Sequence, residues 1–346
     1  MPGYPELDLV WPNRSSLWAA ADRARPDVVH VSTPGPVGSC GRVWALRRGV
    51  PLVGTYHTDF PAYVDHLFDD RLLTWVCTLA MRGFYQPFAR VFTRSREYVP
   101  ALERLGVESG RIERLAPGID VGAFGRRNRD AAGSIWGRVP GVRCESVKAI
   151  YVGRVSVEKN LKWLSGVWPA VWRSCAARGF NAQLVVVGDG PHRPDMERQL
   201  RGRGAAFAGV RHGAELAAMY ASSDVFVFPS TTDTLGQVVM EAQASGLPAV
   251  VSDRGGPAEM VEDGVTGLVL PVEPAGVAHA RWVEALTGLL TDPARSRRMG
   301  EAASAKIAPM SIERSFEHFW DVHERVHREY RGAKATTPAC IRAGGR

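Results

Sequence analysis

The sequence predicts an α/β protein made of two domains with parallel sheets. Short runs rich in β-branched residues recur along the chain, and each precedes a stretch with helical spacing, which is the alternation typical of parallel sheets. Two runs, Val185-Val186-Val187 and Val225-Phe226-Val227-Phe228, are apolar throughout, as expected for strands covered by helices on both faces. The chain has 346 residues, more than one hydrophobic core usually serves, so two doubly wound domains are expected.

The expected strands divide into an amino-terminal and a carboxyl-terminal group. Residues 126–147 separate the groups and are rich in Gly, Pro and charged residues, which predicts a linker. The predicted strands are Asp27–Val31, Pro51–Tyr56, Arg90–Thr93, Lys148–Val152, Ala182–Val187, Asp224–Phe228, Leu247–Ser252 and Thr266–Leu270.

These boundaries predict an amino-terminal domain over 1–125 and a second domain over 148–308. Within residues 309–331, the stretch from Ser311 has apolar residues at three- and four-residue spacings, so we expect a helix whose apolar face packs back on the amino-terminal domain. The tail, 332–346, has the composition of a disordered segment.

Composition excludes several functional classes. No apolar run approaches the roughly 20 residues that span a bilayer, and the start lacks a secretory signal. The five cysteines are scattered and form no CxxC pair, which argues against a disulfide framework or a zinc site and favours the cytoplasm. The net charge of +7 comes from arginines spread along the chain without a nucleic-acid module, so no nucleic-acid partner is expected.

The segment from Phe228 to Pro248 carries the most informative pattern. A buried strand ends at Pro229, residues 232–234 offer N-cap side chains, and a helix follows until Gly246 stops it. Such a helix begins at the carboxyl end of a parallel strand, where open α/β sheets bind ligands.

The start of this helix is expected to bind a diphosphate. Backbone N–H groups of Leu235, Gly236 and Gln237 would face the anion, and Gly236 would allow close approach. If the helix is regular, Asp233 and Glu241 lie about 12 Å apart along it. A nucleotide sugar can reach both carboxylates, with Asp233 accepting hydrogen bonds from the transferred sugar and Glu241 from the ribose.

Two further segments offer groups for the same ligand. Arg154 follows a strand and Lys159 begins the next helix, so both cations can stabilise a departing nucleoside diphosphate. No Asp-x-Asp metal pair is present, so metal-independent transfer without a cofactor is expected. The glycine turn at Gly188 and Asp189 allows close backbone approach, and Val210 would place backbone groups against the base.

The ordered set of motifs resembles a known family. The motifs are Gly153-Arg154, Glu158-Lys159-Asn160, Val187-Gly188-Asp189-Gly190-Pro191, Ala221-Ser222-Ser223-Asp224, Pro229-Ser230, Asp233 with Glu241-Ala242, and Gly246-Leu247-Pro248. Together they resemble the retaining glycosyltransferases of family 4, closest in look to bacterial α-mannosyltransferase-like and sulfoquinovosyltransferase-like members. The resemblance covers most of the chain. It implies the GT-B fold, with two facing Rossmann-like domains.

The resemblance also implies roles for individual residues. Arg154 and Lys159 match the family's diphosphate-binding cations, and Asp233 and Glu241 match its acidic pair. The usual first acid is Glu; the shorter Asp233 leaves the sugar open. The segment after Tyr56 resembles the one whose histidine approaches the donor sugar, so His57 is expected to position sugar or acceptor rather than act as a base.

The resemblance implies transfer of a hexose-type sugar from a nucleotide diphosphate sugar to a hydroxyl acceptor, a glycan or a glycolipid, with retention of configuration. Family members usually begin with a strand and a glycine loop, whereas this chain starts at Met1-Pro2-Gly3, so we expect the amino-terminal domain to lack that first unit. A catalytically inactive nucleotide-sugar-binding or interaction protein is therefore the alternative.

Two features of the amino-terminal half have simpler explanations. Asp59 precedes Phe60-Pro61 and is expected to cap the helix that follows. The segment from His66 to Phe88 is expected to form a buried helix, because amphipathic helices usually face a core. The alternative is a helix on the inner surface of a membrane, with three arginines toward anionic lipid. Its apolar residues are Leu67, Phe68, Leu72, Leu73, Trp75, Val76, Leu79, Met81, Phe84 and Tyr85, and its arginines are Arg71, Arg82 and Arg90.

Overall fold

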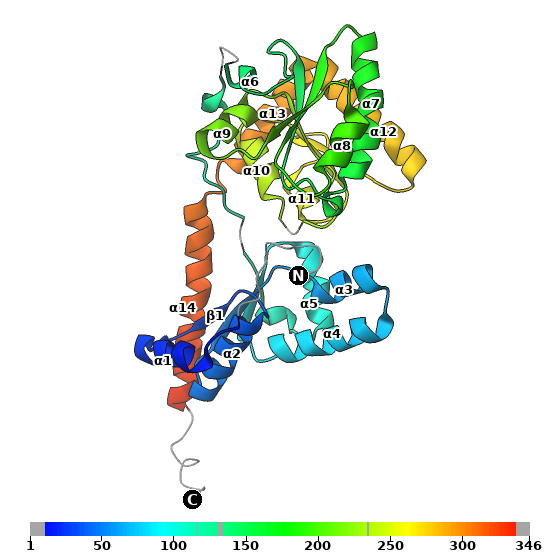
Figure 1. The fold of residues 1–346 in the computed structure, drawn as a ribbon. Coiled ribbons are helices and arrows are strands. Elements are labelled where there is room, and N and C mark those ends of the chain that lie inside the picture. Colours follow the sequence, from blue (N-terminus) through cyan, green and yellow to red (C-terminus); the bar gives the residue numbers. More distant parts are fainter. Residues whose placement is uncertain (1–10, 116, 131–133, 234, 337–346) are drawn as a thin grey trace, which may run out of the picture. The chain divides into compact units, whose positions relative to one another are not determined.

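The computed structural model describes residues 11–115, 117–130, 134–233 and 235–336. The chain divides into two compact units, unit 1 with Met1–Ala116 and Glu313–Arg346, and unit 2 with Pro117–Ile312. Each unit is an α/β body around a parallel sheet, which confirms the predicted fold class (Figure 1). All eight predicted strands are present, and the structure adds β4 (Ile112–Arg114) and β7 (Ala205–Gly209).

Unit 1 is built on a four-stranded sheet in the order β1-β2-β3-β4, with all neighbours parallel. Its other strands are β1 (Val29–Val31), β2 (Leu52–Tyr56) and β3 (Arg90–Thr93). One cluster of buried side chains joins Leu52 and Tyr56 of the sheet to neighbouring helices. The helices preceding the carboxyl-terminal one are α1 (Arg14–Ala24), α2 (Pro36–Arg48), α3 (Phe60–Phe68), α4 (Arg71–Tyr85) and α5 (Val99–Arg104).

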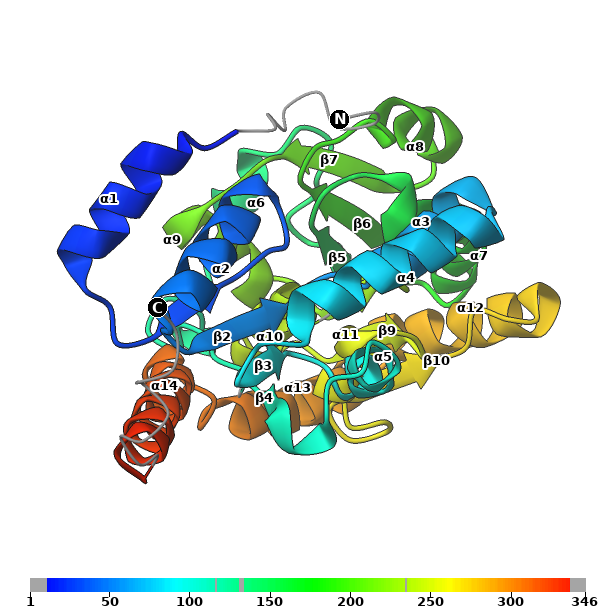
Figure 2. The same cartoon turned by 90° about the horizontal axis from the view of Figure 1, so that it is seen from below.

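The last helix, α14 (Ile312–Thr336), packs on the sheet of unit 1. Val53 and Phe92 of the sheet form a buried cluster with Val322 and Val326 of the helix. Figure 1 shows α14 extending past β1 of this unit, and Figure 2 shows the same helix nearly end-on. The helix continues five residues beyond the expected end at Arg331, and the rest of the expected disordered tail, residues 337–346, lies outside the described residues.

Helix α4 differs from its prediction. Of the residues in α4, only Phe84 and Tyr85 are buried. Several of its other large apolar side chains are exposed, so the expectation of a buried helix was wrong. Arg90 is also not directed to a membrane, because it pairs with Glu329 at 2.9 Å. Asp59 caps α3 by accepting a hydrogen bond from the backbone of Ala62, as predicted. No helix in the described ranges is both long and apolar enough to cross a bilayer.

Unit 2 has a six-stranded parallel sheet in the order β7-β6-β5-β8-β9-β10. In chain order this is 3-2-1-4-5-6, the order of dinucleotide-binding α/β folds, and the direction of winding reverses between β5 and β8. The strands are β5 (Val147–Val152), β6 (Ala182–Val187), β8 (Val225–Phe228), β9 (Ala249–Ser252) and β10 (Gly267–Leu270). The main helices are α7 (Leu161–Ala177), α8 (Arg193–Leu200), α9 (Gly213–Ala221), α10 (Gln237–Ala244), α11 (Gly256–Met260), α12 (Ala275–Thr291) and α13 (Pro293–Ile307).

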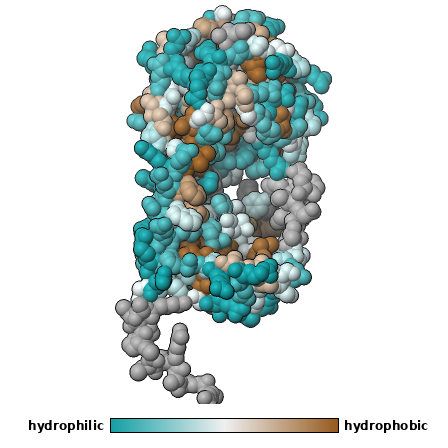
Figure 3. Space-filling view, turned by 90° about the vertical axis from the view of Figure 1, so that its left-hand side faces the viewer, coloured by the Kyte–Doolittle hydropathy of each residue, from teal (hydrophilic) through white to brown (hydrophobic). Residues whose placement is uncertain are grey.

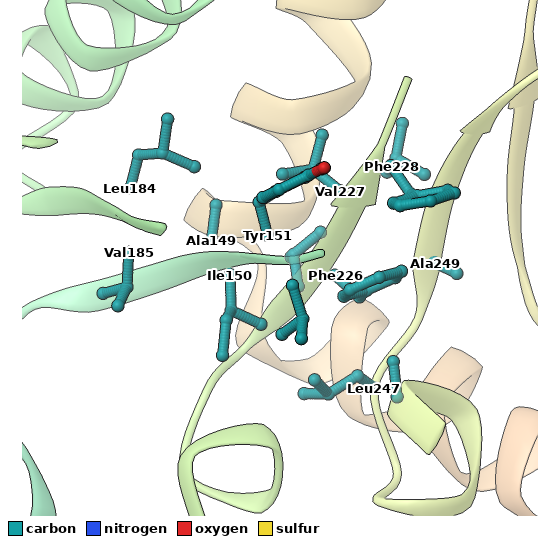
Figure 4. Close-up of a cluster of buried hydrophobic side chains, with 14 of the residues drawn as sticks. Ala149, Ile150, Tyr151, Leu184, Val185, Phe226, Val227, Phe228, Leu247 and Ala249 are labelled. Atoms are coloured by element: carbon teal, nitrogen blue, oxygen red, sulfur yellow. The ribbon is translucent and has the colours of Figure 1, made fainter. Parts of the chain in front are cut away.

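The core of unit 2 follows from its continuous apolar strands. All residues of β6, β8 and β9 are buried, because helices cover both faces of the sheet. Tyr151 and Phe228 stack with ring centroids 5.8 Å apart, and Phe226 stacks on Phe228 (Figure 4). These rings pack across β5 and β8, the two paired strands at the reversal point.

The segment 126–147 belongs to unit 2, and several of its residues pack in the core of that unit. It contains a 3-10 turn, Arg126–Asn128, and the short helix α6 (Ser134–Gly137). Ile135, Trp136 and Val139 in this segment are buried in the core cluster of unit 2. This segment is rich in Gly and Pro, which predicted a linker, yet three of its apolar side chains are buried in the core. The boundary between the two units falls between Ala116 and Pro117.

Candidate functional site

Three of the predicted site residues of unit 2, Arg154, Lys159 and Asp233, lie in the two loops at the reversal point of its sheet. Strand β5 ends at Val152 and leads into the loop that carries Arg154 and Lys159, while β8 ends at Phe228 and leads into the loop that carries Asp233. Since β5 and β8 are parallel neighbours, both loops leave the same edge of the sheet. Ligands of open α/β sheets bind in the crevice outside this edge.

The two loops are joined by an ion pair that the sequence did not predict. Lys159 Nζ lies 2.7 Å from Asp233 Oδ1, and about a fifth of each side chain remains exposed. Asn160 also donates to the carbonyl of Pro229, and Thr232 donates to the carbonyl of Glu158. The pair is therefore held by both loops, and the predicted cation and acid form one unit.

Asp233 keeps one oxygen for another partner. Its Oδ2 is buried and accepts no hydrogen bond within the described residues. A buried carboxylate oxygen without a donor is costly, and such an atom gains most from a hydroxyl or N–H group supplied by a ligand. Asp233 can therefore bind a hydroxyl group while Lys159 holds its other oxygen.

Helix α10 begins later than expected. It starts at Gln237, and its N-cap is Gly236 with φ 73° and no side-chain cap, so the prediction of N-cap side chains at residues 232–234 was wrong; Thr234 itself lies outside the described residues. The spacing of about 12 Å assumed a helix through Asp233, and that condition is not met. A Cβ on Gly236 would lie only 2.9 Å from the Cα of Pro257, so both the φ angle and the space require glycine.

The late start still leaves donors at the helix end. Among the described residues, the backbone N–H groups of Gln237 and Val238 bond to no other group, while those of Val239 and Met240 bond to the carbonyl of Gly236. The side chain of Leu235 is buried in the core, so only its backbone could face a ligand. Free N–H groups with the positive end of the helix dipole favour an anion here.

Glu241 lies on α10 with a partner that the sequence did not indicate. The Tyr220 hydroxyl donates to Glu241 Oε2 at 3.1 Å, and Tyr220 is completely buried. Burial raises the pKa of Glu241, and the hydrogen bond from Tyr220 opposes that rise. Tyr220 is 21 positions away in the chain, so no local pattern links the two. The tyrosine orients the carboxylate, and Oε1 accepts no hydrogen bond from the described residues.

The glycine turn after β6 supports the loop of Arg154. Gly188 has φ 133°, and a Cβ there would overlap the carbonyl oxygen of Gly153. Val155 donates its backbone N–H to the carbonyl of Asp189 at 2.8 Å, and the Asp189 side chain pairs with Arg193. The backbone of the neighbouring loop, at Gly153, therefore lies in the space that a side chain at position 188 would need.

The other predicted residues come from other segments of the chain. Val210 follows β7, and its side chain is 51% exposed, which suits contact with a flat apolar or aromatic group. Gln237 donates to the carbonyl of Gly118 at 3.4 Å within the same unit. His57 follows β2 in unit 1 and is exposed. Desolvation and the nearby Arg94 guanidinium lower the pKa of His57, which favours its neutral form.

A cavity of about 260 Å³ lies elsewhere in unit 2, at the amino-terminal edge of the sheet. Its lining includes Val147, Asp224 and Leu247, which begin or precede strands, together with Arg129. No predicted site residue lines it. Among the described residues, no three His, Cys, Asp or Glu side chains form a group that could hold a metal ion.

The sequence matches two family models and several curated proteins. The family model described as "Glycosyl transferases group 1" matches residues 146–292, and the one described as "Glycosyltransferase Family 4" matches residues 1–123. A sulfoquinovosyl transferase of Arabidopsis thaliana is 32% identical over 306 residues, covering 87% of this chain and 57% of the relative. A GDP-mannose-dependent alpha-mannosyltransferase of Mycobacterium tuberculosis is 35% identical, covering 73% of this chain and 64% of the relative.

A third relative aligns along nearly the whole chain. The D-inositol 3-phosphate glycosyltransferase of Nocardia farcinica is 31% identical, covering 97% of this chain and 70% of the relative. The chain thus spans less than two thirds of the first two relatives. Among solved structures, the Anabaena protein Alr3699/HepE, in complex with UDP and glucose, has a TM-score of 0.72 at 16% identity, covering 90% of this chain and 81% of its own. That likeness shows a shared GT-B fold.

Proposed function

Because this chain belongs to the glycosyltransferases of family 4, we propose that it transfers a hexose-type sugar from a nucleotide diphosphate sugar to a hydroxyl acceptor. The observation that carries the proposal is the Lys159–Asp233 ion pair at the reversal point, where Asp233 keeps a buried acceptor oxygen without a partner. The relatives named as GDP-mannose-dependent and sulfoquinovosyl transferases support a nucleotide-sugar donor without fixing its base or sugar.

Each group of the site has a role in this proposal. The donor diphosphate binds at the free N–H groups of Gln237 and Val238, with Lys159 and Arg154 neutralising the charge that grows as the diphosphate departs. Asp233 Oδ2 accepts a hydrogen bond from a hydroxyl of the transferred sugar. Glu241, oriented by Tyr220, accepts from the ribose hydroxyls. The exposed Val210 and the turn at Gly188 and Asp189 border the base and diphosphate.

Titration calorimetry with uridine, guanosine and adenosine diphosphates tests donor binding. One nucleotide should bind, and Lys159→Met or Glu241→Gln should each weaken it roughly tenfold or more, since each removes a charged hydrogen-bonding group. Lys162→Met is the matched control, because Lys162 is an exposed lysine three residues from Lys159. If no nucleotide binds, or if Lys162→Met weakens binding as much as Lys159→Met, the site assignment is wrong.

Retention and independence of metal are finer parts of the proposal. We expect the product to keep the donor's anomeric configuration, with the departing phosphate taking the acceptor proton, so that His57 positions substrate instead of acting as a base. Arg154 and Lys159 neutralise the charge of the departing diphosphate, which a divalent metal ion does in other transferases. An inverted product by NMR would contradict the first statement, and activity lost with EDTA and restored by Mg²⁺ would contradict the second. Nucleotide binding without transfer to any acceptor would instead favour a binding protein.

We further propose that α3 and α4 contact a membrane surface peripherally, at the cytoplasmic face, which would suit a lipid-linked acceptor. Exposed apolar residues recur on α4 at positions i, i+3, i+4 and i+7, while Thr74 and Thr78 on its other side are half-buried. Arg71 and Arg82 are exposed on the same helix. The exposed apolar residues are Leu72 (69%), Trp75 (58%), Val76 (49%) and Leu79 (46%), with Phe68 (61%) at the end of α3.

A helix that packs on a core buries its apolar side, whereas α4 exposes its apolar side. An exposed apolar stripe of this kind marks an interaction surface, and Trp with flanking Arg suits the boundary between headgroups and acyl chains. The face of the molecule drawn in Figure 3 is mostly hydrophilic, with some apolar groups among the polar ones. Asp69 and Asp70 adjoin the stripe, so apolar burial should contribute more than attraction to anionic lipid.

Sedimentation with vesicles tests this surface. Wild-type protein should bind phosphatidylglycerol vesicles, and Leu72→Glu with Leu79→Glu should abolish binding while leaving nucleotide affinity unchanged, because both side chains are exposed. Val277→Glu, at an equally exposed valine of unit 2, is the control. If the double variant still binds vesicles, or if it instead converts a dimer into a monomer, the surface serves another partner.

A further inference from the structure

Strand register in unit 1 brings two polar residues together outside the donor site. Tyr56 of β2 pairs with Thr93 of β3, so the next residues, His57 and Arg94, leave adjacent strands at the same edge. Neighbouring strands lie about 4.8 Å apart, and alternate residues share a face. His57 and Arg94 therefore lie next to each other just beyond the two strand ends, close to Phe92, on which α14 packs.

Arg94 differs from the arginines around it. Among the described residues it donates no hydrogen bond and forms no ion pair, and its Nε is buried without an acceptor. Arg90 pairs with Glu329, Arg48 with Asp22 and Arg111 with Glu108. A half-buried guanidinium without an acceptor is costly to keep, and an anion that binds there would remove the cost.

The electrostatics agree with the geometry. The Arg94 guanidinium contributes, after desolvation, to lowering the pKa of His57, so its charge acts directly on that ring. His57 in turn contributes to lowering the pKa of His30 on the same face. Within the described part of the chain, the carboxyl-terminal edge of β2 and β3 therefore holds the positive charge of Arg94 without a paired acid, at the edge where a parallel sheet binds its ligand.

We propose that the acceptor carries an oxyanion, bound by Arg94 with His57 as a second donor. This inference rests on the proposed transferase function and adds a substrate class to it. The planar guanidinium can donate two parallel hydrogen bonds to a phosphate monoester or a carboxylate, and an anion would raise the pKa of His57 and allow both ring nitrogens to donate. Phosphate and carboxylate share this chemistry, so the experiment separates them.

The first test does not depend on turnover. The ring signals of His57 are followed by NMR during a pH titration of the full chain, with and without inorganic phosphate. Phosphate should raise the pKa of His57 in the wild type and leave it unchanged in Arg94→Gln, whereas Arg94→Lys should keep part of the effect. Arg104→Gln, at an exposed arginine of the same unit, is the control and should respond as the wild type does. No phosphate effect in the wild type, or an equal effect in Arg94→Gln, would overturn the proposal.

The second test uses transfer. Polyol acceptors are compared as phosphate monoesters, as carboxylates and without either group. Arg94→Gln should raise the KM of the anionic acceptor roughly tenfold or more and leave the affinity for the nucleoside diphosphate unchanged. Equal use of neutral and anionic acceptors by the wild type would refute the oxyanion requirement. If nucleotide binding fails as well, the proposed function has failed, and the histidine titration alone then decides the anion site.

Discussion

Unit 1 should lose stability in mild acid through two histidines, His30 and His323, that lie far apart in the sequence and meet only in the fold. His30 Nδ1 lies 2.9 Å from His323 Nε2 on α14, and His30 Nε2 lies 2.9 Å from the Thr55 hydroxyl. His323 Nδ1 lies 2.7 Å from the carbonyl of Phe319, which can only accept, so His323 Nδ1 carries the proton there. His323 Nε2 then accepts from His30, and His30 Nε2 accepts from Thr55. Both rings are neutral in this chain of hydrogen bonds.

The magnitude follows from the pKa. Burial, with the neighbouring His323 and His57, lowers the pKa of His30 from 6.5 to about 4. A difference of about 2.5 between the two pKa values corresponds to about 3.4 kcal/mol, and because His30 is only partly buried we expect about 2 kcal/mol. The unfolded chain binds the proton first, so this stability is present above pH 6.5 and is lost as the pH falls from 6.5 to 4.

Urea unfolding at pH 7 and pH 4.5, followed by hydrogen exchange of α14 peptides, measures this loss in unit 1. His30→Gln should lower stability at pH 7 and reduce the dependence on pH by about 2 kcal/mol. His212→Gln, at an exposed histidine of unit 2, should leave the pH dependence of α14 unchanged. If His30→Gln and the wild type lose the same stability between the two pH values, the reasoning is refuted.

Three further outcomes are expected. Tyr220→Phe keeps the packing of the ring on Phe124 and Phe226 but removes the hydrogen bond to Glu241, so nucleotide affinity should fall about fivefold by calorimetry, and an unchanged affinity would exclude the orienting role. Gly188→Ala should cost about 2 kcal/mol or more in urea unfolding, because a Cβ overlaps the backbone of Gly153; a neutral result would show that the turn can open. Trp168→Ala removes a fully buried ring and its hydrogen bond to the carbonyl of Arg203, so it should lower the free energy of unfolding by about 3–5 kcal/mol. A loss below about 1 kcal/mol would show that neighbouring side chains fill the space left by the ring.

Much of the fold could be predicted from the sequence, because the signals that carry it are local. The continuous apolar runs of β6 and β8 need cover on both faces wherever they occur, and the eight predicted strands are all present. The two strands that were missed carry weak signals. β4 is only Ile112–Arg114, and β7 is the alanine-rich Ala205–Gly209. Neither run is long or apolar enough to be distinguished from a loop.

The candidate residues of the donor site could also be identified from the sequence. The order of the motifs indicates which residues to expect, but it does not indicate which residues contact one another. Only the tertiary structure decided that Lys159 and Asp233, 74 positions apart, form an ion pair, and that Tyr220 holds Glu241. The reversal of winding between β5 and β8 brings those loops to one edge, and no local pattern encodes a reversal.

The same distinction explains the two errors about surfaces and helix ends. The spacing of apolar residues on α4 predicted an amphipathic helix but could not tell which side faces the protein, because periodicity does not record what lies against a face. The start of α10 was set by the space beside Pro257, which admits only a glycine at position 236. Local propensity therefore determined which elements form, whereas long-range packing decided where they begin and which groups they bring together.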